Sequence, residues 1–169
     1  IADLAIDHNL LVLSDEIYEK ILYDEKHYSI GAMEGMQDRT ITVNGFSKSY
    51  AMTGWRLGYV AANETFLHDF QKIQSHSVSS ATTFAQYGAI EALEGDQQPV
   101  EDMVVEFRQR RDILVDGLND IGIHCSRPKG AFYAFADVSE YGNGEEIAEK
   151  LLSDAHVAAT PGSAFGPSG

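Results

Sequence analysis

Lys48 lies between two serines within the stretch Gly45–Gly58, and it follows a β-branched run that is typical of a strand. Ligands bind at strand ends in open α/β sheets, because the loops there converge on a crevice. A lysine in such a crevice can lose its proton when it is partly buried or close to other cations, and its amine can then attack an aldehyde. Lys48 is therefore a candidate nucleophile for covalent chemistry with a carbonyl compound.

The residues around Lys48 could also bind a phosphate group. Arg56 carries a planar guanidinium whose fork matches phosphate oxygens, and Ser47 and Ser49 add hydroxyl groups. Three glycines in the same stretch let the backbone come close to a ligand. Serines, glycines and a lysine are also common loop residues, so these residue types alone do not define a site.

A second candidate group follows the apolar run Leu10–Leu13. Asp15 comes just after this run, and the phenol of Tyr18 follows three residues later. The alternative is that Ser14 and Asp15 cap a helix, with Tyr18 packing beside it. Taken by themselves, these residues favour the capping interpretation.

The hydrophobic pattern predicts an α/β framework for these residues. Helical spacing over residues 1–9 runs directly into a fully apolar strand at 10–13, a succession typical of an α/β unit with a buried sheet. Further strands are predicted at 40–44 and 57–62. Helices are predicted at 64–76, in a segment ending near residue 95, and at 99–121, where Gly122 is a plausible C-cap.

The later part of the chain resembles a small α+β domain. Strands are predicted at 123–126, 131–138 and 157–160, with a helix at 145–153. We therefore predict two domains, residues 1–112 and residues 113–169, which the long helix joins.

Composition excludes several classes of function. The chain has 26 acidic and 12 basic residues and a formal net charge of −14, so it repels nucleic acids and anionic lipids. No run reaches the ~20 apolar residues of a membrane span. The single Cys125 fits a reducing compartment, and we expect a cytoplasmic protein. The six histidines lack zinc-like spacing, so no metal is expected. The acidity fits either adaptation to a salty cytoplasm or an ordinary acidic protein.

The stretch around Lys48 resembles the lysine-attachment pattern of class I and II aminotransferases, which are pyridoxal-phosphate enzymes of fold type I. The match covers every defined position of that pattern, namely Gly45, Ser47, Lys48, Ala51, Met52, Gly54, Arg56 and Gly58. Segments 128–133 and 161–166 are similar to small-domain segments of the family, so the resemblance extends over essentially the whole chain. The run 50–56 looks most like the prokaryotic aspartate aminotransferase branch.

The resemblance implies a role for each candidate residue. Lys48 would hold pyridoxal 5'-phosphate as a Schiff base. Asp15 would pair with the protonated pyridine nitrogen, and Tyr18 would hydrogen-bond the 3-oxygen of the ring. Arg56 and Ser47 would anchor the phosphate. By this resemblance Asp15 and Tyr18 belong to the site, and the capping interpretation loses its weight.

The resemblance also implies a fold and an activity. Residues 1–112 would be the later part of a large three-layer α/β/α domain, and residues 113–169 an incomplete small α+β domain. The activity would be transamination between an amino acid, with aspartate favoured, and a 2-oxo acid such as 2-oxoglutarate. Relatives are homodimers with active sites at the subunit interface, so a homodimer is expected of the intact protein.

The chain departs from the family pattern in two ways. Many relatives have a phosphate-binding serine three places before the lysine, where this chain has Gly45. Other parts of the family's site would lie before Ile1, and the arginine that binds the substrate carboxylate would lie after Gly169. We therefore expect the 169 residues alone to bind the cofactor weakly and to be inactive.

Two alternatives stay open. One is a carbon–sulfur β-lyase on the same scaffold, because the alignment of substrate bonds with the ring selects the reaction. The other is a regulatory module that resembles an aminotransferase and binds the cofactor without turnover. A half-reaction with aspartate distinguishes transamination from both.

Overall fold

The computed structural model describes residues 1–167. Its residues form two compact units. The first unit comprises Ile1–Val105 and Lys129–Ala131, and the second comprises Glu106–Pro128 and the chain from Phe132 onward. The sequence-based boundary at residue 112 stays a prediction. Helix α4 (Gln98–Asp120) contributes residues to both units.

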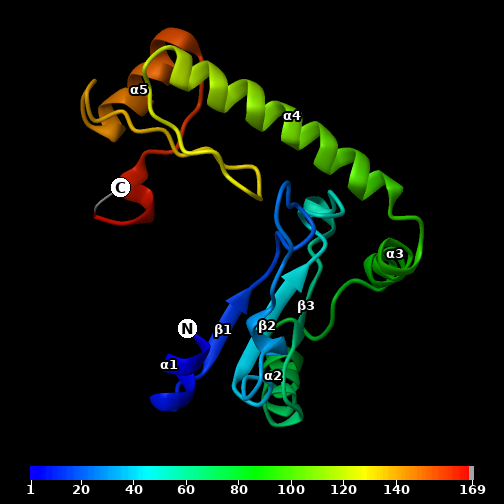
Figure 1. The fold of residues 1–169 in the computed structure, drawn as a ribbon. Helices are drawn as coiled ribbons and strands as arrows, with labels where there is room; N and C mark the ends of the chain where they lie inside the picture. The colour runs from blue at the N-terminus through cyan, green and yellow to red at the C-terminus, as the bar shows by residue number, and fades with distance from the viewer. Residues whose placement is uncertain (168–169) are drawn as a thin grey trace. The chain divides into compact units, whose positions relative to one another are not determined.

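A three-stranded sheet is the centre of the first unit (Figure 1). Its strands are β1 (Val12–Asp15), β2 (Thr40–Gly45) and β3 (Gly58–Ala61), in the order β1-β2-β3. Strands β1 and β2 are parallel, whereas β2 and β3 are antiparallel. The carboxyl ends of β1 and β2 therefore lie at one edge of the sheet, where β3 begins.

Strand β1 differs from its sequence-based prediction. It begins two residues later than the apolar run at 10–13 and includes the polar Ser14 and Asp15. The expectation that this run is fully buried is wrong for the described chain, because Leu13 is 70% exposed and Leu11 is 61% exposed. No described segment covers that face of β1. The other two strands agree with their predictions to within about one or two residues.

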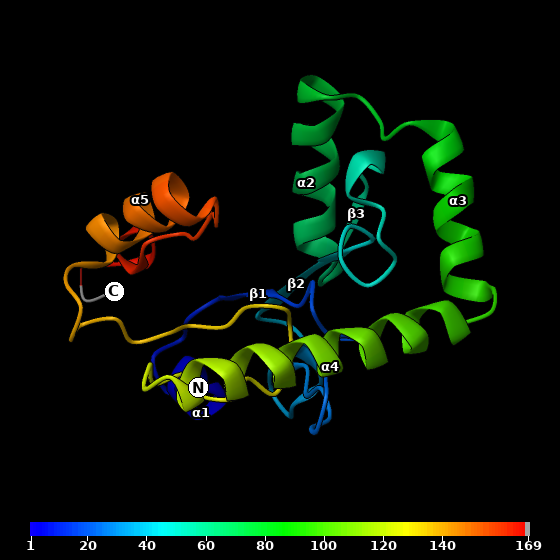
Figure 2. The same ribbon diagram turned by 90° about the horizontal axis from the view of Figure 1, so that it is seen from above.

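The helices of the first unit confirm the sequence pattern. They are α1 (Ala2–Asp7), α2 (Glu64–Ser77), α3 (Thr83–Glu94) and the first part of α4. The amide oxygen of Asn63 caps α2 by accepting from the Thr65 amide at 3.0 Å. Figure 2 shows α2 and α3 as separate helices joined by a short connection. None of the described helices is long and apolar enough to cross a membrane.

Residues 129–131 return to the first unit through backbone hydrogen bonds. The Tyr23 amide donates to the Lys129 carbonyl, and the Ala131 amide donates to the Ile21 carbonyl. Gly130 lies opposite Leu22, and a Cβ at residue 130 would lie only 2.9 Å from the Ile21 carbonyl oxygen. A side chain at residue 130 would therefore separate the two segments.

The second unit contains fewer strands than the sequence predicted. It contains the later part of α4, helix α5 (Gly144–Ala155) and a 3-10 helix at Gly162–Phe165. The predicted strands at 123–126, 131–138 and 157–160 do not form, and one isolated bridge joins Cys125 to Ala136. A strand requires a neighbour that pairs along its length, and these segments have no such partner among the described residues.

Helix α4 is tied to the chain that follows it by side-chain contacts within the second unit. The Asn119 amide group donates to the carbonyls of Val115 and Cys125, and its oxygen accepts from the Cys125 amide. The buried Arg111 donates to the Pro128 carbonyl at 2.9 Å. Gly122 ends the helix with φ of +87°, as the predicted C-cap requires.

The buried Ile21 provides a test of the packing in the first unit. Its side chain is fully buried (0% exposed), so Ile21→Ala should lower the free energy of unfolding by about 2–5 kcal/mol. Urea unfolding followed by circular dichroism measures this change. The matched control, Ile1→Ala, truncates a side chain that is 87% exposed and should change stability by no more than about 0.5 kcal/mol. Equal effects at the two positions would contradict the assigned core.

Candidate active site

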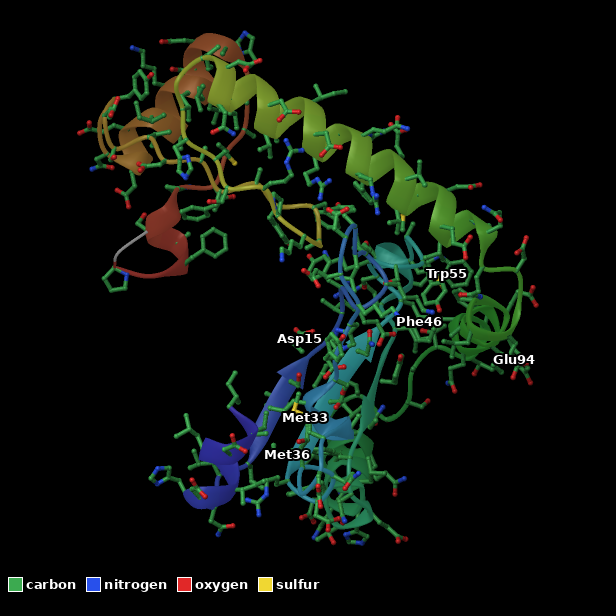
Figure 3. The ribbon with its side chains drawn as sticks, in the orientation of Figure 1. Asp15, Met33, Met36, Phe46, Trp55 and Glu94 are labelled. Atoms are coloured by element: carbon green, nitrogen blue, oxygen red, sulfur yellow. The ribbon has the colours of Figure 1, made fainter. Side chains whose placement is uncertain are left out.

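Three of the residues singled out in the sequence lie at the carboxyl ends of the two parallel strands. Asp15 is the last residue of β1, opposite Val43 of β2, and Lys48 follows the end of β2 by three residues. The Lys48 Nζ lies 5.9 Å from the centre of the Tyr18 ring. Figure 3 labels Asp15, at the end of β1, and Phe46, which directly follows β2. The fold thus brings Lys48 next to Tyr18 although 30 positions separate them in the chain.

A turn after β1 sets the direction of Tyr18. The Asp15 Oδ1 accepts from the Ile17 amide at 3.2 Å, the Glu16 carbonyl accepts from the Glu19 amide, and the Tyr18 carbonyl accepts from the Ile21 amide. These bonds form turns, and no helix follows, so the helix-capping interpretation of Asp15 is wrong. Asp15 is exposed at the sheet edge and Tyr18 is half-buried.

Lys48 lies in a compact loop that closes on itself. The Met52 amide donates to the Phe46 carbonyl, and the Ala51 amide donates to the Lys48 carbonyl. The side chains of Phe46 and Met52 pack with Ala89 of α3 in a buried cluster. The packing of Phe46 and Met52 in this cluster therefore fixes the loop that carries Lys48.

Thr53 connects the two residues that were predicted to bind phosphate. Its Oγ1 donates to the Ser47 carbonyl at 2.9 Å, and its own carbonyl accepts from Arg56 Nη1 at 2.9 Å. Arg56 has a left-handed backbone with φ of 53°, and its side chain is exposed. The contribution of Thr53 was not predicted from the sequence, although its place between Ser47 and Arg56 was an available signal.

The close approach of β2 and β3 explains why residue 45 is a glycine. Gly45 pairs with Gly58, and a Cβ at residue 45 would lie 3.1 Å from both the Gly58 Cα and the Leu57 carbonyl oxygen. A serine at this position, as the resemblance led one to expect, would crowd the backbone of β3. Any hydroxyl contact to a phosphate must therefore come from elsewhere, and Ser47 is the nearest candidate in the sequence.

Trp55 holds the residues before Arg56 against α3. Its ring lies 5.9 Å from the ring of Phe84, measured between centroids, and a Cβ at Gly88 would lie 2.6 Å from the indole. The indole therefore packs directly over the backbone of α3, which requires a glycine at residue 88.

A buried carboxylate lies beside the candidate site. Glu16, which is 6% exposed, accepts on Oε1 from the hydroxyls of Ser14 at 3.0 Å and Ser29 at 2.9 Å. Its Oε2 lies 2.7 Å from His27 Nε2. We call these four residues the Glu16 cluster. Burial raises the pKa of Glu16, but the hydrogen bonds from His27, Ser29 and Ser14 and the charge of His27 outweigh it, so the pKa is lowered from 4.5.

The Glu16 cluster was not predicted from the sequence. His27, one of the six histidines for which no metal was expected, pairs with Glu16 in the structure. The available signal was the alternation of side chains along β1, which places Glu16 on the face opposite to Asp15. Burial raises the pKa of Tyr59, a residue of β3, above its ordinary value, and the negative charges of Glu19 and Glu16 raise it further.

Comparison with known proteins identifies the family of the chain. The pattern of the family "Aminotransferase class I and II" matches residues 1–169. The chain is 51% identical to a probable aspartate aminotransferase of Methanocaldococcus jannaschii, over 100% of this chain and 45% of that protein. It is 52% identical to an aspartate aminotransferase of Musicola paradisiaca, over 98% of this chain and 42% of that protein.

A solved structure agrees in fold. The crystal structure of an aromatic aminotransferase from Pyrococcus horikoshii superposes with a TM-score of 0.96 at 44% identity, covering 99% of this chain and 46% of that one. The chain belongs to the class I and II aminotransferase family. The α/β fold class of a partial fold-type-I large domain is thereby confirmed, and pyridoxal phosphate is the cofactor that the family implies. The chain spans less than half the length of the relatives it matches.

The lowered pKa of Glu16 predicts an acid-dependent loss of stability. A carboxyl whose pKa is lower in the folded than in the unfolded state stabilises the fold above its ordinary pKa, and this contribution disappears as the pH falls through the folded pKa. We expect the wild-type free energy of unfolding to fall more steeply below about pH 4.5 than that of Glu16→Gln. Urea unfolding between pH 7 and pH 3 measures both.

Glu25→Gln is the control for this prediction, because Glu25 is exposed and pairs with Lys129 outside the Glu16 cluster. The free energy of unfolding of Glu25→Gln should fall below about pH 4.5 nearly as steeply as that of the wild type, and more steeply than that of Glu16→Gln. A Glu16→Gln profile parallel to the wild type over the whole range would contradict the assignment.

Proposed function

We propose that the whole protein is a pyridoxal-phosphate-dependent aminotransferase that moves an amino group between an amino acid and a 2-oxo acid. The observation that carries the proposal is the 5.9 Å contact between Lys48 Nζ and the Tyr18 ring, at the adjoining carboxyl ends of β1 and β2. It supports the proposal because the two residues come from the two sequence segments that match the family's cofactor-binding pattern.

The residues at this edge of the sheet fit pyridoxal phosphate. The Lys48 amine would attach to the aldehyde of the cofactor, and the exposed carboxylate of Asp15 would pair with its protonated pyridine nitrogen. The Tyr18 hydroxyl would hydrogen-bond the ring oxygen. When bound, the cofactor supplies the electron sink that stabilises negative charge on the substrate Cα.

Lys48 would also act in proton transfer. When its Nζ is not attached to the cofactor, the amine can accept the proton from the substrate Cα and return it to the C4′ carbon of the cofactor. The compact loop from Phe46 to Met52 supports this role, because it fixes the backbone from which the long side chain extends.

Arg56 and Ser47 would hold the phosphate. Arg56 is exposed, and its guanidinium can form two parallel hydrogen bonds to phosphate oxygens. Thr53 donates to the Ser47 carbonyl and accepts from Arg56 Nη1, so it would hold the Arg56 guanidinium close to the backbone of Ser47.

Aspartate is the favoured amino-group donor and 2-oxoglutarate the favoured acceptor. The support comes from the curated relatives, of which those from M. jannaschii and M. paradisiaca are named for aspartate. We place the activity in the cytoplasm, in keeping with the single cysteine and with the acidic composition.

A homodimer is part of the proposal. Its support is the face of α3, where Phe84 is 69% and Tyr87 is 71% exposed, since large apolar side chains grouped on a surface mark interaction sites. Light scattering coupled to size-exclusion chromatography should give the mass of two chains for the whole protein. Tyr87→Glu should give the mass of one, and a monomeric wild type would contradict the proposal.

The half-reaction tests the activity. The whole protein, loaded with pyridoxal phosphate and given aspartate without a 2-oxo acid, should produce pyridoxamine phosphate, which chromatography quantifies. Lys48→Ala should slow this conversion at least ~100-fold, because the proton acceptor is lost.

Lys20→Ala is the matched control. The Lys20 Nζ also lies 5.9 Å from a tyrosine ring, that of Tyr50, but Lys20 is not assigned a role in the reaction. This variant should retain the wild-type rate within about twofold. If an amino acid with a thioether on Cβ replaces aspartate, release of a thiol, ammonia and a 2-oxo acid without pyridoxamine phosphate would indicate a β-lyase. No conversion of any substrate by the wild type would indicate a regulatory module.

A further inference from the structure

We propose that Glu16 is a positioning residue whose buried hydrogen bonds fix the end of β1, so that Asp15 and Tyr18 are held in place for the cofactor. The inference rests on the proposed function. It assigns a role to the Glu16 cluster that the family's attachment pattern around Lys48 does not include.

Side chains alternate between the two faces of the sheet at the end of β1. Asp15 is exposed, whereas Glu16 is buried, so the two carboxylates point to opposite faces of the sheet. The Glu16 amide donates to the Val43 carbonyl at 2.8 Å and continues the ladder between β1 and β2. The buried side chain of Glu16 and the exposed side chain of Asp15 therefore extend from one stretch of backbone, which is paired with β2.

Glu16 also joins separate segments of the chain. Its Oε1 accepts from Ser14 within β1 and from Ser29 beyond the turn, and its Oε2 contacts His27. The Glu16 carbonyl also accepts from the Glu19 amide and so begins the turn that contains Tyr18. The carboxylate thus ties the start of this turn to the segment at 27–29.

Residue 16 is a charged glutamate although its side chain is buried. Burial of a carboxylate is unfavourable unless hydrogen bonds compensate for the lost water, and here three side chains do so. Apolar residues of similar volume often replace buried ionic groups with little loss of stability, so stability alone does not require Glu16. The directional hydrogen bonds instead specify one conformation for the end of β1.

Hydrogen bonding accounts for the cluster better than a bound metal ion does. Glu19 brings a carboxylate oxygen within 4.8 Å of ligand atoms of Glu16 and His27, a spacing that a metal ion could bridge. Both carboxylate oxygens of Glu16, however, already have hydrogen-bond partners.

The test compares two substitutions of Glu16 in the whole protein. Glu16→Met fills the space without polar atoms, and Glu16→Gln keeps an oxygen for the two serines and an amide group that can donate to His27. Two properties are measured well below the melting temperature, namely the Kd of the apoprotein for pyridoxal phosphate and the pH midpoint at which the absorbance of the bound cofactor changes.

Glu16→Met should raise the Kd on the order of tenfold, as loss of a residue that orients a ligand-binding group does in metal sites, and it should shift the pH midpoint. Glu16→Gln should restore the Kd to within about twofold of the wild type. Glu25→Met is the matched control for removal of an exposed carboxylate nearby, and it should change neither property.

Wild-type Kd and pH midpoint in Glu16→Met, even with a lower melting temperature, would overturn the proposal, because Glu16 would then only stabilise the fold. Equal losses in Glu16→Met and Glu16→Gln would overturn it as well, since hydrogen bonding would not be the cause. If Glu16→Met does not fold, the Kd and the pH midpoint are measured for the double substitution Ser14→Ala and Ser29→Ala instead. The same changes are expected of it, and wild-type values would overturn the proposal. Failure of the wild type itself to attach the cofactor would contradict the proposed function instead.

Discussion

The parallel pairing of β1 with β2 is the constraint on which the candidate site depends. It places Asp15 opposite Val43, so both strands deliver their next residues to the same edge of the sheet. Tyr18 follows one strand and Lys48 follows the other, and the two side chains meet there. Parallel strands require a long connection, which accounts for the distance between the two halves of the site in the sequence.

Local packing then limits how the loops at this edge can move. Gly45 and Gly58 allow the backbones of β2 and β3 to approach closely, which leaves no room for a side chain at residue 45. Phe46 and Met52 anchor the Lys48 loop to α3, and the Thr53 carbonyl accepts from the guanidinium of Arg56. The Glu16 cluster lies on the face of the sheet opposite to Asp15, where its hydrogen bonds hold the turn that contains Tyr18.

Much of the site was predictable because it depends on strand order and on a local motif. The strand at 40–44 and the long helix at 99–121 follow from β-branched residues and from helical spacing, and both formed as predicted. The strands at 123–126 and 157–160 did not form, because apolar residues alone do not supply a pairing partner. Glu16 was missed for a related reason: its hydrogen bonds to residues 27 and 29 depend on a turn whose path the sequence pattern does not specify.

The most direct test of the central claim is to locate the covalently bound cofactor. The whole protein would be incubated with pyridoxal phosphate, reduced with borohydride, digested with trypsin and analysed by mass spectrometry. A reduced adduct on Lys48 blocks cleavage at that residue, so the account predicts a modified peptide spanning Thr40–Arg56. An adduct on another lysine, such as Lys20, or no adduct at all would contradict it.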